Sequence, residues 1–256
     1  MMPNLPFQIK SKFVVLSLHR SGSSLLVDLL DRVPDIKCYC ELFKPYTEYT
    51  DRNWLKANSG RYSDWKEEVQ QNPLKYMNEI LAMNTHCKAV GFKLLHGHHS
   101  DVIHHVVHSS EFRKIILNRH PVSRYISHAR AVSTGKWCKL SDSDSSTPML
   151  TFNVKMFNTI LMSHRKFQSI VDRVKSQPDN LITVVDYDDV VNLSGVELII
   201  RDLGITCPPR TDLVSSFRKQ TTEPIESLFT NYKELKSWIM REHTDLMEQP
   251  GAPQLT

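Results

Sequence analysis

The residues best suited to bind an anion form a short loop, HRSGSS, at positions 19–24. An apolar run at 13–18 precedes this loop, and leucines at helical spacing follow it. A strand, a loop of small residues and a helix start aim free backbone N–H groups at an anion, and the helix start adds roughly half a positive charge. The arginine adds a planar fork of donors, the serines add hydroxyls, and the glycine allows close approach. The predicted ligands are Arg20, Ser21, Gly22, Ser23 and Ser24.

This loop differs from the P-loop of nucleotide triphosphatases. That motif, G-x-x-x-x-G-K-[ST], has a glycine five residues before its second glycine and a lysine directly after it. Here Ser17 and Ser23 stand at those two positions around Gly22. A P-loop-type small-molecule kinase is therefore the weaker alternative. A serine-rich turn with no ligand is the purely structural alternative.

A second candidate anion site follows a later apolar segment, RKIILN, at 113–118. Arg119 ends this predicted strand, and Ser127 lies eight residues further along, on the helix that follows. A guanidinium at a strand end and a hydroxyl on the facing helix can both reach one phosphate. Arg124 and Arg130 lie nearby, either behind these two residues or facing solvent. The alternative is a basic amphipathic helix on the protein surface.

Together, these two segments resemble the PAPS-dependent sulfotransferases. The stretch RSGSSL at 20–25 is similar to the loop that binds the 5′-phosphosulfate in carbohydrate and nodulation-type members. Arg119 and Ser127 have the spacing with which cytosolic members hold the 3′-phosphate of the donor. The resemblance covers residues 13–235 and is strongest to the nodulation and trehalose-type group. That group is indicated by ELF at 41–43, GFK at 91–93 and GKW at 135–137.

The resemblance implies a donor and a reaction. The donor is PAPS (3′-phosphoadenosine 5′-phosphosulfate), and its sulfuryl group passes in line to a hydroxyl or amine, leaving adenosine 3′,5′-bisphosphate. Negative charge then grows on the leaving phosphate oxygen, where Arg20 and the backbone N–H groups of 22–24 would stabilise it. A sulfuryl group carries less charge than a phosphoryl group, and the chain offers no clean carboxylate pair for magnesium. We therefore expect no metal requirement.

Two further donor contacts are expected from the resemblance alone. Tyr187, in the segment DYDD, is similar to a tyrosine that contacts adenine, although a core aromatic at a strand end is an equal alternative. Arg218, Lys219 and Gln220 are similar to a basic loop that closes over the 3′-phosphate and adenine. That loop usually reads Arg-Lys-Gly, so the glutamine is a departure from the pattern.

The acceptor needs a general base, and two residues are candidates. Glu41 matches the position of the base proposed in trehalose-type enzymes, and we prefer it. His96 lies near the histidine of cytosolic members, one residue out of register. Lys93 is a candidate to neutralise the sulfuryl oxygens, or else a surface lysine. A metal site made of His96 and the neighbouring histidines lacks a cysteine or carboxylate partner and is disfavoured.

The elements that must position these groups alternate along the chain. Apolar runs predict strands at 13–18, 36–40, 88–95, 113–118 and 181–186. Helical patterns occupy most of the intervening stretches, with a break expected at Pro73. We predict an α/β, P-loop-like three-layer fold with a central, mostly parallel sheet flanked by helices. Ligands of such sheets bind at the carboxyl ends of the strands, where all the candidate groups lie.

Two capping boxes and three segment boundaries complete the prediction. Ser194 with Glu197, and Asn231 with Glu234, have the spacing of capping boxes, the second opening a final helix through Met247. We expect a flexible lead-in at 1–11, one sulfotransferase domain at 12–248 and a flexible tail at 249–256. Residues 44–62 are polar and aromatic and are expected to shape an acceptor pocket or a lid.

Composition limits the partners and the compartment. The net charge of +4 suits an anionic ligand but is too small to indicate nucleic acid. Five cysteines, with no C-x-x-C pair, indicate neither a disulfide framework nor a zinc site. No apolar run approaches the ~18 residues of a membrane span. We expect a cytoplasmic enzyme with a small-molecule or carbohydrate acceptor and neither nucleic acid nor membrane as a partner; a catalytically silent nucleotide-binding protein is the other alternative.

Overall fold

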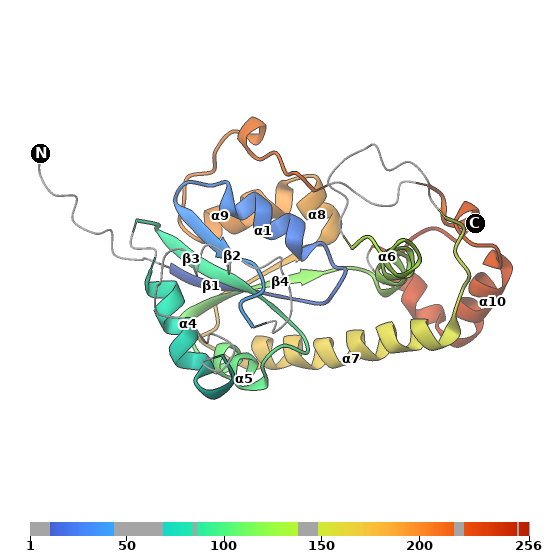
Figure 1. Ribbon diagram of the computed structural model, residues 1–256, viewed down its shortest axis with the longest axis horizontal. Coiled ribbons are helices and arrows are strands. Elements are labelled where there is room, and N and C mark those ends of the chain that lie inside the picture. Colours follow the sequence, from blue (N-terminus) through green and yellow to red (C-terminus); the bar gives the residue numbers. More distant parts are fainter. Residues whose placement is uncertain are drawn as a thin grey trace, which may run out of the picture.

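A five-stranded parallel sheet forms the centre of the computed structural model, which describes residues 11–43, 69–83, 86–137, 148–217, 223–249 and 251–255 (Figure 1). The strands are β1 (Ser11–Ser17), β2 (Ile36–Tyr39), β3 (Ala89–Leu95), β4 (Phe112–Asn118) and β5 (Ile182–Asp186). Their spatial order is β2-β3-β1-β4-β5, and each neighbouring pair runs parallel. All five carboxyl ends therefore lie at one edge, as the sequence predicts.

Helices cover both faces of the sheet, which gives the three-layer α/β fold. One face packs against α1 (Ser23–Asp31), α8 (Tyr187–Val191) and α9 (Ser194–Asp202). The other packs against α4 (Pro73–Ala82), α5 (Ser100–His108) and the carboxyl-terminal half of α7 (Val154–Ser176). Strand side chains alternate between faces, so Phe13 and Val15 join the first layer while Val14 and Leu16 join the second. The apolar run of β1 is continuous because both its faces are buried.

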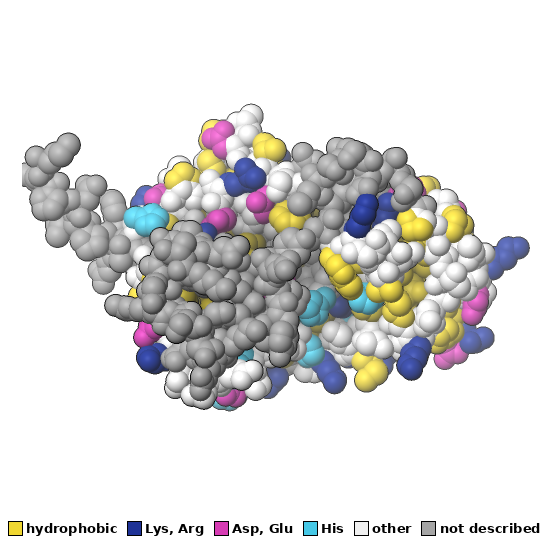
Figure 2. All heavy atoms as spheres, viewed as in Figure 1, with side chains coloured by type: hydrophobic (Ala, Val, Ile, Leu, Met, Phe, Trp, Pro, Cys, Tyr) yellow, Lys and Arg dark blue, Asp and Glu magenta, His cyan; other side chains and the backbone are white. Residues whose placement is uncertain are grey.

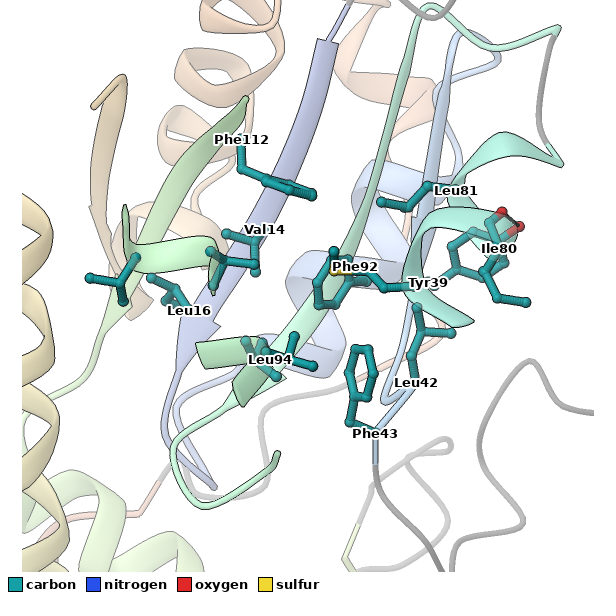
Figure 3. Packing of buried hydrophobic residues seen from close by; sticks show 14 of the residues in the cluster. Val14, Leu16, Tyr39, Leu42, Phe43, Ile80, Leu81, Phe92, Leu94 and Phe112 are labelled. Carbon is teal, nitrogen blue, oxygen red and sulfur yellow. Dashed lines mark hydrogen bonds between the residues drawn. The ribbon is translucent and has the colours of Figure 1, made fainter. Parts of the chain in front are cut away.

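The second layer is the more aromatic of the two. Figure 3 shows Phe92 of β3 between Phe112 of β4 and Phe43, which follows β2. The ring of Phe92 meets Phe43 and Phe112 edge to face, with centroids 5.6 and 6.3 Å apart. Such pairs add specific geometry to area burial. They hold the ends of β2 and β3 in a fixed relation, close to the residues that follow these strands.

A third apolar cluster lies beyond the sheet. It joins α6 (Pro121–Thr134), the amino-terminal half of α7 and α10 (Tyr232–Glu242), at the right of Figure 1. Tyr125 stacks on Phe229 and packs against Phe157 at the centre of this cluster. Helix α7 contributes Phe157 here and Phe167 to the sheet layer, so one helix connects the two cores. The short 3-10 helices are η1 (Arg210–Asp212), η2 (Ile225–Ser227) and η3 (Thr244–Glu248).

Both predicted capping boxes are wrong in detail. Ser194 is the first residue of α9 rather than its cap, which is Leu193 at φ 70°, and the Glu197 carboxylate instead pairs with Arg210 at 2.6 Å. Asn231 does precede α10, but its side chain binds the Phe152 N–H at 2.7 Å instead of capping the helix. Neither helix therefore has the reciprocal side-chain-to-backbone bonds of a capping box, although Asn231 Nδ2 does donate to Glu234 Oε2 at 2.8 Å.

The last predicted helix is also shorter than expected. It ends at Glu242, and the chain continues into η3 instead of running as one helix through Met247. His120, at the start of α6, binds the Leu246 carbonyl through Nε2 at 2.7 Å and so fixes this turn against α6. Among the described residues, no helix is both long and apolar enough to cross a membrane.

Candidate active site

The crevice between the carboxyl ends of β1 and β4 is the switch point of the sheet. From β1 the chain passes through α1 to β2 on one side, whereas from β4 it passes through α6 and α7 to β5 on the other. Ligands of parallel sheets bind where neighbouring connections diverge in this way. The loop at 19–22 and Arg119 lie at this crevice, and Arg119 Nη1 donates to the Arg20 carbonyl at 2.9 Å.

The loop after β1 is held by its own residues. Ser21 is buried and its hydroxyl donates to the Leu18 carbonyl at 2.5 Å, so this side chain braces the loop. Gly22 is the residue before α1 and has φ 88°, a conformation that L side chains rarely adopt. Because no side chain of the described residues caps α1, the N–H groups of its first turn stay available for an anion.

The ring of Tyr187, the first residue of α8, lies close to Gly22. A Cβ atom added to Gly22 would lie 2.4 Å from Cδ2 of Tyr187, so a larger residue is excluded by this contact as well as by φ. The other neighbour of the ring is Arg119, whose Cζ lies 3.9 Å from the ring centroid. Gly22, Tyr187 and Arg119 therefore meet at one point of the carboxyl edge. The place of Tyr187 in the sequence indicated it as a candidate site residue but did not predict that its ring lies against Arg119.

The Arg20 side chain reaches across to α6. Its Nε and Nη2 donate to the Ser127 hydroxyl at 3.1 and 2.9 Å, and Nη1 donates to the Trp137 carbonyl. Arg20 itself has φ 65°, in the left-handed region that residues other than glycine seldom adopt. Sequence reasoning assigned Arg20 and Ser127 to different phosphates of one donor. The structure brings the two side chains into contact.

Two arginines at the crevice, Arg119 partly buried and Arg124 fully buried, have no carboxylate of the described residues bonded to them. For Arg119, burial lowers the pKa, although Tyr187 and Asp188 act in the opposite direction, and Nε lacks a hydrogen-bond partner among the described residues. Arg124 is only 1% exposed and donates from Nε to the His19 carbonyl at 3.0 Å. Burial, and then the charge of Arg119, lower the Arg124 pKa to about 10. The sequence left two alternatives for Arg124, behind Arg119 and Ser127 or facing solvent, and its burial excludes the second.

Glu41 and Lys93 form an ion pair at the ends of β2 and β3. Lys93 Nζ lies 2.9 Å from Glu41 Oε1 and 3.2 Å from the Ser24 hydroxyl, on the first turn of α1. Lys93 is 1% exposed, so the surface-lysine alternative is wrong. Burial lowers the Lys93 pKa, but the interactions with Cys40 and Glu41 together outweigh burial, and the pKa is raised. This pair therefore keeps a charged lysine beside the helix start.

His96, the other candidate base, has different neighbours. It follows β3, and its N–H binds the Ser17 carbonyl at 3.0 Å. Burial, then the charges of Lys166 on α7 and Arg124 on α6, lower the His96 pKa. The structure thus places Glu41 with Lys93 near α1, and His96 on the side of α6 and α7.

Of the remaining predicted site residues, the structure describes Ser23 but not the Arg-Lys-Gln loop. Ser23 is buried at the first position of α1. Arg218, Lys219 and Gln220 lie outside the described residues, as do residues 44–62. Within the described part of the chain, no group of three or more His, Cys, Asp or Glu side chains is arranged to hold a metal ion.

Comparison with known proteins finds solved structures with a similar fold. No protein-family model and no curated protein matches the chain. The structure is similar to the sulfotransferase domain from the curacin biosynthetic pathway, with a TM-score of 0.50 and 11% identity over 86% of this chain and 83% of that one. It is also similar to mouse sulfotransferase SULT7A1 complexed with PAP (TM-score 0.47, 14% identity, 95% and 86% covered) and to shikimate kinase from Bacteroides thetaiotaomicron (0.44, 12%, 76% and 99%). The chain thus has a P-loop-like, three-layer α/β fold that is found in sulfotransferases.

Proposed function

We propose that the protein is a PAPS-dependent sulfotransferase that acts on a hydroxyl or amine of a small-molecule or carbohydrate acceptor. One observation carries this proposal: Arg119, which is partly buried, and Arg124, which is fully buried, both bond to carbonyls of the loop at 19–22, and neither forms an ion pair with a carboxylate of the described residues. Buried positive charge is unfavourable unless it is paired. An anionic ligand at the carboxyl edge would supply the missing charge, and the open first turn of α1 faces the same ligand.

The donor binds in our proposal along the crevice between β1 and β4. Its 5′-phosphosulfate lies against the N–H groups of 22–24, and the 3′-phosphate lies between Arg119 and Ser127. Tyr187 would line the adenine side, because its ring already packs on Gly22 and Arg119. Arg218, Lys219 and Gln220 would close over the 3′-phosphate. Arg20 contacts Ser127, so it can serve the 3′-phosphate there or turn toward the leaving phosphate.

Transfer then needs one proton acceptor and one stabilised leaving group. The acceptor oxygen or nitrogen forms a bond to sulfur while the bond from sulfur to the phosphate oxygen breaks. Glu41 takes the acceptor proton, and the helix start with Arg20 stabilises the charge on the leaving phosphate. Lys93, held between Glu41 and Ser24, would neutralise sulfuryl oxygens and orient the base.

Calorimetric titration with adenosine 3′,5′-bisphosphate and, separately, with ATP and magnesium tests the donor class. We expect the bisphosphate to bind and ATP to bind much more weakly, because Ser23 stands where a P-loop kinase has lysine. Tighter binding of magnesium ATP would favour a kinase instead. A screen of hydroxyl and amine acceptors with labelled PAPS, read by mass spectrometry, then tests turnover; bisphosphate binding without any transfer would favour a catalytically silent protein.

A further inference from the structure

Two residues form the joint between β4 and α6 at the edge of the crevice. Arg119 and His120 belong to neither element, and Pro121 begins α6. Arg119 is a proposed ligand of the 3′-phosphate, and its guanidinium donates to the Arg20 carbonyl. Ser127, the other proposed ligand, lies about two turns into α6. The conformation of the joint therefore decides where both proposed ligands lie.

The His120 side chain makes two hydrogen bonds that hold this joint. Nδ1 accepts from the Val122 N–H at 3.3 Å and so caps α6, while Nε2 lies 2.7 Å from the Leu246 carbonyl oxygen. An amide N–H only donates and a carbonyl only accepts, so the ring is the neutral tautomer with its proton on Nε2. The side chain is buried, and loss of either bond would leave a buried polar group without a partner.

Histidine is an unusual residue to cap a helix. Asn, Asp, Ser and Thr are the common capping residues, because a short side chain with one acceptor is sufficient. The residue before Pro121 is restricted to an extended backbone, and His120 has φ −53° and ψ 134°, so its backbone is already fixed. The imidazole ring adds a second nitrogen on its far side, which reaches a carbonyl 126 positions later in the chain.

The turn that His120 reaches, η3, is built into the third apolar cluster. Leu246 is buried in this cluster, and the ring of His243, directly before η3, stacks on Phe157 with centroids 6.2 Å apart. Figure 1 shows this part of the molecule beyond the sheet, and Figure 2 shows hydrophobic side chains at the surface over α6 in the same region. The bond from His120 therefore connects the third cluster directly to the joint at the crevice.

We propose that His120 is a positioning residue for the 3′-phosphate and that η3 supports this part of the donor site from outside the crevice. The proposal rests on the proposed function, because it takes Arg119 and Ser127 to hold the 3′-phosphate. His120 does not touch the ligand. Its bond to Val122 sets the start of the helix that carries Ser127, and its bond to Leu246 keeps the joint, and with it Arg119, at the crevice.

Three substitutions separate the two bonds of His120. His120→Ala removes both bonds. His120→Asn keeps an acceptor in the place of Nδ1 and is a good cap, but its side chain is too short to reach Leu246. His120→Gln can place an amide N–H where Nε2 lies, but it is a poor cap. For each variant, calorimetry gives the bisphosphate preference, which is the ratio of the affinities for adenosine 3′,5′-bisphosphate and adenosine 5′-phosphate.

The positioning role predicts an order among these variants. His120→Ala and His120→Asn should lower the bisphosphate preference about threefold or more, with less than about a twofold change in affinity for adenosine 5′-phosphate. His120→Gln should keep more of the preference than His120→Asn, because it keeps the bond to Leu246. Ile160→Val is the control for stability alone: it removes one methylene from the same apolar cluster and should leave the preference unchanged.

Hydrogen exchange in the unmodified protein is a second test that needs no variant. Coupling between two sites is reciprocal, so a ligand that depends on η3 should also suppress local opening of η3. The bisphosphate should slow exchange of the Leu246 N–H, which bonds to the His243 carbonyl at 3.0 Å, by about threefold or more, and adenosine 5′-phosphate should slow it less. The control is η1, another 3-10 helix, whose Arg210 pairs with Glu197 of α9.

Each outcome supports or overturns the proposal. An unchanged bisphosphate preference in all three His120 variants overturns the positioning role and leaves the proposed function standing. Full preference in His120→Asn overturns the role of η3, because the cap alone is then sufficient. If the variants do not fold, the exchange test decides, and equal slowing in η3 and η1 overturns the proposal. Absence of bisphosphate binding in the unmodified protein overturns the proposed function itself, and the positioning role with it.

Discussion

Two lysines are buried in the same sheet at opposite edges, and their partners differ. Lys93 of β3 lies near the carboxyl edge, pairs with Glu41 at 2.9 Å, and has a raised pKa. Lys114 of β4 lies near the amino edge and donates to two neutral oxygens, the Ser109 carbonyl and the Asn180 side chain. Burial lowers its pKa to about 8. Both lysines are buried, so the charge of the partner decides the direction in which the lysine pKa is shifted.

The difference indicates what each edge of the sheet does. Asn180 also donates to the Val107 and Val174 carbonyls, so the amino-edge lysine belongs to a hydrogen-bond network that joins the ends of α5 and α7. The carboxyl-edge lysine contacts a carboxylate and the helix start that we propose as the donor site. Changes at the carboxyl edge should alter binding and turnover, and changes at the amino edge should alter stability.

Glu41→Gln should have the largest effect. The amide keeps the shape of the carboxylate but cannot take a proton at neutral pH, so turnover should fall by ~10²–10⁴, the usual contribution of a general base. Bisphosphate affinity should hardly change, because Glu41 does not touch the donor in our proposal. His96→Gln, made in parallel, should affect turnover much less; the reverse ranking would make His96 the base.

Arg20→Ala should lower turnover by ~10²–10³, the typical effect of removing one preorganised donor at a developing anion. Steady-state assays under saturating PAPS measure the effect. Arg173→Ala, on the exposed side of α7, is a matched loss of a guanidinium away from the crevice and should leave turnover unchanged. Turnover of Arg20→Ala within about threefold of the unmodified protein would exclude the role assigned to Arg20.

Arg119→Ala should act on binding rather than on chemistry. The 3′-phosphate is remote from sulfur, and a charge-assisted hydrogen bond contributes ~1.5–3 kcal/mol, so bisphosphate affinity should fall about tenfold or more. Ser127→Ala should have a smaller effect, because its hydroxyl is neutral. If either change lowers turnover at saturating PAPS but leaves affinity intact, the proposed 3′-phosphate site is wrong.

Lys114→Met should have the smallest effect on function and a measurable effect on stability. The folded-state pKa of about 8 is below the ordinary 10.5, so the unfolded chain binds more protons between these values. Lys114 should therefore make the unmodified protein gain stability as pH rises from about 8 to 10.5. Thermal unfolding across this pH range should lack that gain in Lys114→Met, with bisphosphate affinity unchanged. A matching gain in the variant would contradict the assignment.

The fold could be predicted because its signals are local. Apolar runs such as that at 13–18 identify strands buried on both faces, and the helices between them require a parallel sheet. The sheet and its flanking helices are confirmed. Local spacing also located the loop at 19–24 and the strand-end residue Arg119, because the carboxyl ends of parallel strands must share an edge.

The contacts between elements could not be predicted in the same way. Burial of Lys93 depends on Glu41 and Ser24, which come from two other elements. The bond from Arg20 to Ser127 and the burial of Arg124 depend on how α6 is rotated against the loop after β1. The cap expected at Ser194 was wrong because the preceding residue adopts a left-handed backbone. The sequence pattern of one segment does not indicate which side chains of other elements it will contact.

The most direct test of the account compares adenosine 3′,5′-bisphosphate with adenosine 5′-phosphate in the unmodified protein. The two ligands differ only in the 3′-phosphate, which a PAPS-dependent enzyme must bind and a kinase need not. We predict that the bisphosphate binds at least roughly tenfold more tightly, as expected for one charge-assisted contact from Arg119 with a hydrogen bond from Ser127. Equal affinity for the two ligands in calorimetric titration would contradict the proposal that this crevice is a PAPS site.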